Sequence, residues 1–208
     1  MTTLVPPVDA EDRVRAALDA PVDHAQILEL PPVCYLMVDG LGPPEAPAFT
    51  DAVHAVYGLT YALRDALRAS GMEVAPILPL EALWRSSTGE VWRPEAPHEW
   101  NWTVMIAQPA EVSRDLVRAA REQARLRHRS PALDRARLET YEAGLVGQIL
   151  HVGPYIAEWP TLARLHAELR AEGYEAVGPH HEVYLDTPRR TPQDQLRTVL
   201  RAGVRRRT

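Results

Sequence analysis

Several residue types are scarce in this sequence, and each shortage excludes a class of structure or partner. Cys34 is the one cysteine, so no disulfide can form within the chain, and its apolar neighbours are typical of a buried strand rather than a reactive thiol. Lysine is absent, and the formal net charge is -5. A sequence-independent nucleic-acid-binding protein needs a basic surface to neutralise phosphates. We therefore expect no direct binding of nucleic acid.

Long apolar runs are also missing. No stretch approaches the roughly 20 apolar residues that a membrane-spanning helix needs, and no apolar signal segment follows Met1. We expect a cytoplasmic protein with no membrane partner. Hydrophobic residues make up 46% of the 208 residues, which is enough to form the core of a globular domain.

The first half of the chain contains signals for a strand, a helix and two further strands, at residues 33–40, 49–67, 74–87 and 101–109. The helix is indicated by apolar residues at helical spacing, including Val53, Val56 and Leu63. Pro76 and Pro79 interrupt the second strand segment, which predicts an edge or bulged strand.

The same element order returns in the second half. A helix rich in Ala, Arg and Leu links the two halves, and then a strand, a helix and two strands are expected at residues 137–153, 158–172, 180–185 and 196–204. Gly144 and Gly147 interrupt the first of these strands.

The repeated order predicts an α+β fold. We expect an N-terminal extension at residues 1–31, then one domain at 32–205 made of two βαββ modules, 32–107 and 137–205, joined by a helical linker at 108–136. The modules would form a pseudo-twofold repeat and share one antiparallel sheet. Helices would pack on one face of the sheet, and the other face would form a groove between the modules, which is a natural ligand site.

An acid in the middle of a strand is the most informative local feature. The segment HHEVYLDTPRR begins at His180, and its Val, Tyr and Leu are strand formers. Because side chains alternate along a strand, His180, Glu182 and Tyr184 share one face. Among aromatic rings a carboxylate either gains a raised pKa and acts as a general acid or base, or pairs with a cationic ligand. The alternative is a solvated or salt-bridged strand glutamate.

Aromatic residues supply the surroundings that such an acid needs. They make up only 6% of the chain, yet five are tryptophans against a single phenylalanine. The set that we expect to form an aromatic box around Glu182 is Trp84, Trp92, Trp100, Trp102, Tyr155, Trp159 and Tyr184. For any one of these tryptophans, simple filling of the core or of a sheet edge is the competing interpretation.

A second candidate group is HVGPY. Gly153-Pro154 predicts a turn between a strand and a helix, which would bring Tyr155 to the mouth of the groove with His151 one step below it. The phenol could donate a hydrogen bond to a ligand oxygen. A tyrosine that only caps the turn remains the alternative.

The sequence lacks the motifs of metal-dependent enzymes, serine hydrolases and phosphate-binding proteins. Five residues are candidate metal ligands: His151, His166, His180, His181 and Glu182. Adjacent histidines on a strand point to opposite faces, and the sequence has neither HExxH nor a cysteine pair, so we expect no metal. A nucleophile elbow and a glycine-rich phosphate loop are also absent. No cofactor is expected.

Several segments together resemble a known family. The stretches LHVGPY, TLARLH, HHEVYLDTPRR and LRTVLR, with PLEALW and WNWTVMIAQP upstream, are similar to the GyrI-like small-molecule-binding family over about residues 32–205. The chain resembles the standalone members, which carry no DNA-binding domain.

The resemblance implies two strand-helix-strand-strand modules with a ligand pocket between them. In members fused to regulators this pocket binds cationic or aromatic drugs, and the family's pocket glutamate falls on Glu182. Tyr155 and Trp84 match family pocket positions, while His151, Trp102, His180 and Tyr184 are added from strand geometry. One departure is Arg85, where members often have a second aromatic.

Two functions follow as expectations. Some standalone members hydrolyse cyclopropanoid cyclopentenone genotoxins, which suggests Glu182 as the base and Tyr155 as the hydrogen-bond donor of a hydrolase. The alternative is a non-enzymatic module that sequesters drugs or contacts gyrase or a regulator. The expected partner is therefore a small aromatic or cationic ligand, and the internal repeat is compatible with a monomer or a homodimer.

Overall fold

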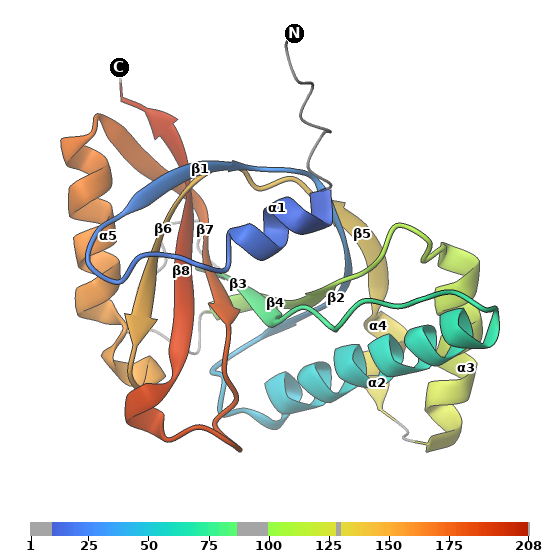
Figure 1. Ribbon diagram of the computed structural model, residues 1–208. Coiled ribbons are helices and arrows are strands. Elements are labelled where there is room, and N and C mark those ends of the chain that lie inside the picture. The colour runs from blue at the N-terminus through green and yellow to red at the C-terminus, as the bar shows by residue number, and fades with distance from the viewer. Residues whose placement is uncertain (1–9, 87–99, 128–129, 208) are drawn as a thin grey trace, which may run out of the picture.

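The computed structural model describes residues 10–86, 100–127 and 130–207 (Figure 1). Strands occupy β1 Gln26–Leu30, β2 Val33–Leu41, β3 Leu80–Ser86, β4 Trp100–Ala107, β5 Arg137–Tyr141, β6 Gly144–Val152, β7 Tyr174–Tyr184 and β8 Arg197–Arg206. Helices occupy α1 Ala10–Ala16, α2 Pro47–Ala69, α3 Arg114–Arg127, α4 Pro131–Arg135 and α5 Trp159–Ala171, with short 3-10 turns η2 Tyr155–Ala157 and η3 Gln193–Gln195.

All described strands belong to one antiparallel sheet with the order β1-β6-β8-β7-β3-β4-β2-β5. The predicted α+β class is confirmed. The outermost strands are β1 and β5. Inside them, one half reads β6-β8-β7 towards the centre and the other β2-β4-β3, and β7 pairs with β3 where the halves meet. This matches the expected repetition of strand, helix, strand, strand, and the pseudo-twofold relation itself stays a prediction.

Two strand predictions are wrong in detail. Residues 137–153 form two strands rather than one, because Gly144, with φ of +62°, turns the chain between β5 and β6. These strands lie in different halves, β5 beside β2 and β6 beside β8. The segment predicted as an edge or bulged strand, β3, is instead central and pairs in unbroken register on both sides. Both prolines precede Leu80, so the backbone of β3 keeps the amide groups that pair with β4 and β7.

The main helices lie on the face of the sheet that carries Glu182. Ala82 and Leu200 flank Glu182 on the neighbouring strands, and directly paired residues point to the same face. Ala82 packs in the core beneath α2, and Leu200 packs in the core beneath α5. Figure 1 shows α5 over one end of the sheet and α2 with α3 over the other.

The opposite face is covered by the N-terminal residues. Val14 of α1 packs against Tyr35, Met37 and Leu83, and Figure 1 shows α1 crossing the sheet. The sequence predicted that this face would be left as a groove, which is wrong. The expected boundary at residues 31 and 32 falls between two strands of the same sheet, since β1 pairs with β6. The segment expected as a linker contains α3 and α4, both packed on α2.

Candidate functional site

Strand β7 places the predicted acid in a buried hydrogen-bonded group. His180, Glu182 and Tyr184 lie on one face, as alternation requires. His180 Nε2 lies 3.0 Å from Glu182 Oε1, and the Tyr184 hydroxyl donates to Glu182 Oε2 at 2.5 Å. A β-bulge between Val177 and His180 precedes this stretch. Glu182 is 7% exposed, so the solvated-glutamate alternative does not hold.

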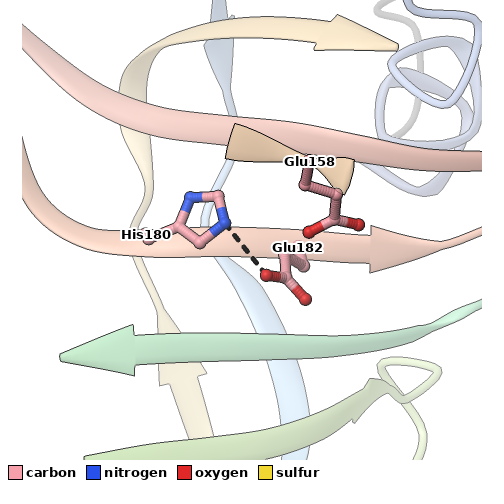
Figure 2. Close-up of side chains that lie close together, drawn as sticks. All are labelled: Glu158, His180 and Glu182. Carbon is pink, nitrogen blue, oxygen red and sulfur yellow. Dashed lines mark hydrogen bonds and ion pairs between the residues drawn. The ribbon is translucent and has the colours of Figure 1, made fainter. Parts of the chain in front are cut away.

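A second carboxyl group lies against the first. Glu158, at the N-terminal end of α5, makes no side-chain capping bond to that helix, and its carboxyl group lies beside that of Glu182 (Figure 2). It is 8% exposed, and its Oε1 has no hydrogen-bond partner among the described residues. Single ligand atoms of Glu158, His180 and Glu182 lie within 4.8 Å of one another.

Glu158 was not among the predicted site residues, because its position in the sequence indicates only the first residue of a helix. The signal was its spacing from Tyr155. Residues three apart in a helical turn share a side, so a tyrosine expected at the ligand site implied that Glu158 faces it too.

The two carboxyl groups have opposite protonation states at neutral pH. Burial, with the nearby charge of Glu182, raises the pKa of Glu158 to about 10. Burial also acts to raise the pKa of Glu182, but hydrogen bonds from His180 and Tyr184 outweigh it and hold that pKa below its usual value. The pair therefore keeps one proton, with Glu182 a carboxylate and Glu158 a carboxylic acid.

Trp84 lies beside the acid pair. It is opposite His180 on β3, its ring stacks on Phe49 at 5.3 Å, and its indole contributes to lowering the pKa of Glu182. Trp102, one strand further, fills the core over Gly40, where an added Cβ would lie 2.1 Å from its ring. Trp100 packs edge-on against Trp84. Trp92 lies outside the described residues.

The turn after β6 brings Tyr155 to the edge of the site. Its ring meets Tyr184 edge-on at 5.5 Å and is 39% exposed, while burial and the charges of Glu158 and Glu182 raise the pKa of Tyr155 to about 12. One ring nitrogen of His151 lies 3.0 Å from Thr161 Oγ1 of α5, and the other lies 3.3 Å from the Pro154 carbonyl of the turn. His151 therefore fixes the turn that carries Tyr155.

The remaining polar candidates separate by face. His181 points away from the acid pair and lies 2.7 Å from Glu81, which also accepts from Tyr35. Glu158, His180 and Glu182 have the residue types and the proximity that could hold a metal ion, although one His180–Glu182 contact is already a hydrogen bond. The predicted absence of a metal stays a prediction.

A hollow among the described residues lies on the face of the sheet opposite the acid pair, lined by Tyr35, Tyr141, His181 and Arg201, with a volume of about 10 Å³. That is room for roughly one water molecule. Both carboxyl groups of the acid pair are buried, whereas Tyr155 beside them is 39% exposed.

Comparison with known proteins places this geometry in a family. The profile of the GyrI-like small molecule binding domain matches residues 25–204, and the chain therefore belongs to that family. No curated protein sequence is significantly similar. No described helix is long and apolar enough to cross a membrane.

Solved structures agree with this assignment. An uncharacterized conserved protein from Listeria innocua is 29% identical with a TM-score of 0.84, covering 92% of this chain and 97% of its own. A hydrolase from Listeria innocua is 27% identical with a TM-score of 0.77 and the same coverage. The C-terminal domain of EcmrR, 9% identical with a TM-score of 0.55 over 88% of this chain and 98% of its own, shares the fold.

Proposed function

We propose that this GyrI-like protein binds a flat aromatic, cationic or electrophilic small molecule at the Glu158–Glu182 pair, and that it hydrolyses a cyclopropanoid cyclopentenone there. The observation that carries the proposal is the buried pair itself. It joins a carboxylate to a carboxylic acid beside Trp84 and Tyr155. The Glu182 carboxylate suits a cation, and the flanking rings suit a flat π-system.

Hydrolysis would use the two carboxyl groups as base and acid. Glu182 takes a proton from water as the water oxygen bonds to the cyclopropane methylene. The strained C–C bond breaks, and its electron pair moves through the enone to the oxygen. That oxygen accepts the proton of Glu158, giving a phenol and a primary alcohol, and Tyr155 donates a hydrogen bond to it. The raised pKa of Glu158, about 10, is close to that of a phenol, which favours this proton transfer.

Similarity supports the enzymatic step at the level of reaction class. The Listeria innocua protein that is 27% identical over nearly all of both chains is a hydrolase. The chemistry needs neither a metal nor a covalent intermediate.

The test follows ring opening by absorbance for the wild type and for Glu182→Gln, with tryptophan fluorescence reporting binding. We expect ring opening to be lost in Glu182→Gln while binding of the neutral substrate is retained. Glu175→Gln, on the same strand but paired with Arg205 at the surface, is the matched control and should behave as the wild type. Equal ring opening by Glu182→Gln and the wild type would refute the assignment of the base.

Binding without turnover is the second candidate function. It is favoured by the lowered pKa of Glu182, because a carboxylate held by two hydrogen bonds is a weaker base. In that case Glu182 serves as the counter-ion of a cationic ligand. Saturable binding with no ring opening by the wild type would select this function.

A further inference from the structure

Exposed apolar side chains gather in the turn between β6 and α5. Ile156 is 96% exposed and Trp159 is 47% exposed, within four residues of sequence. Large apolar groups concentrated at one surface location mark a binding surface more often than chance exposure does. Neither residue contacts the acid pair through a hydrogen bond or ring contact.

The turn geometry connects this surface to the buried site. Hydrogen bonds from Ala157 N to Pro154 O and from Glu158 N to Tyr155 O, at 2.8 and 3.1 Å, close a tight helical turn. Residues three apart share a side of such a turn. Tyr155 and Glu158 therefore face the site, and Ile156 and Trp159 face solvent immediately beside it.

Helix α2 adds aromatic surface from the other half of the molecule. Tyr57 and Tyr61 are one turn apart and their rings stack at 6.4 Å, with Tyr61 55% exposed. Tyr57 is near enough to Tyr155 to contribute to the raised pKa of that phenol. The aromatic surface of α2 therefore lies near Tyr155, whose turn also carries Ile156 and Trp159.

We propose that these side chains form an outer subsite that binds an apolar arm of the ligand while its charged or reactive head lies at Glu158 and Glu182. We call the subsite the apolar rim and define it as Ile156, Trp159, Tyr57 and Tyr61. It rests on the proposed function, because it extends the same site. Continuity argues for a ligand arm: Tyr155 contacts Tyr184 on its inner side and reaches solvent on its outer side.

The test compares two flat organic cations that differ only in the arm, 10-methyl-acridine orange and 10-nonyl-acridine orange. Burial of each methylene strengthens binding about fourfold, so burial of two or more of the extra methylenes gives roughly tenfold or more. We expect the wild type to bind the nonyl dye at least about tenfold more tightly than the methyl dye, measured by fluorescence anisotropy below the dye's micelle concentration.

Variants separate the rim from the acid pair. Ile156→Glu should remove most of the preference for the nonyl dye and leave the methyl dye unchanged. Leu126→Glu, an equally exposed position on α3, is the matched control and should keep the preference. The assignment of the apolar rim would be overturned if the wild type bound the two dyes equally, or if both variants lost the preference for the nonyl dye to the same extent.

Two further outcomes are distinct. If the methyl dye itself does not bind, or binds Glu182→Gln as well as the wild type, the proposed function fails and the rim fails with it. If light scattering shows a wild-type dimer that Ile156→Glu converts to a monomer, the surface is a self-association interface, and the ligand-arm assignment is wrong.

Discussion

The shared proton of the acid pair makes a quantitative prediction about stability. Replacing Glu158 by Gln keeps the size of the side chain and fixes it in a neutral form. Between the ordinary glutamate value of 4.5 and its raised pKa of about 10, folded Glu158 holds a proton that the unfolded chain has released. Its contribution to stability is therefore complete below about pH 4.5 and is lost as the pH rises towards 10.

The magnitude follows from the single proton. Because only the folded state binds this proton, each rise of one pH unit lowers the free energy of unfolding by about 1.4 kcal/mol. From pH 6 to pH 8 the wild type should lose about 3 kcal/mol more than Glu158→Gln, because other titrating groups are common to both proteins.

Urea unfolding at pH 6, 7 and 8 measures this difference directly. We predict that the free energy of unfolding falls more steeply with pH for the wild type than for Glu158→Gln. Parallel pH profiles would show that folded Glu158 is ionised at neutral pH, and the division of the pair into base and acid would be wrong.

Three further predictions concern neighbouring residues. Tyr184→Phe removes a hydrogen bond that lowers the pKa of Glu182, so the acid limb of the pH profile for cation binding should move to higher pH; an unmoved limb would mean that Glu182 does not control binding. Gly40→Ala should lower the free energy of unfolding by about 1–3 kcal/mol, because its Cβ would enter the Trp102 ring. Gly58→Ala, in α2 with nothing within 4 Å of the new Cβ, should raise the free energy of unfolding by about 0.5–1 kcal/mol. Urea unfolding measures both changes. Glu81→Ala should lower the free energy of unfolding by about 2–4 kcal/mol, because His181 and Tyr35 would lose their acceptor. A loss below about 1 kcal/mol would contradict the hydrogen bonds of these two residues to Glu81.

The sequence predicted the elements whose signals are local. Alternation along β7 placed His180, Glu182 and Tyr184 on one face, and the structure has them in one hydrogen-bonded group. The helix positions and the order of elements in each half followed from apolar periodicity in the same way.

What the sequence did not predict depends on contacts between distant segments. The N-terminal cover of the second face is held by long-range bonds, such as those from Gln148 and Arg201 to the Ala17 carbonyl, which periodicity does not encode. The central position of β3 depends on its partners β4 and β7 rather than on its own residues. The spacing of Glu158 from Tyr155 indicated the side on which it lies, but its pairing with Glu182 depends on how α5 packs against β7.

The central claim is that the Glu158–Glu182 pair is the ligand site, and binding of 10-methyl-acridine orange tests it most directly. A buried, charge-assisted contact is worth roughly 1.5–3 kcal/mol, so we predict that Glu182→Gln binds this cation about 10- to 100-fold more weakly than the wild type and Glu175→Gln do. Equal affinity in all three proteins would contradict the account, because the ligand would then bind away from Glu182.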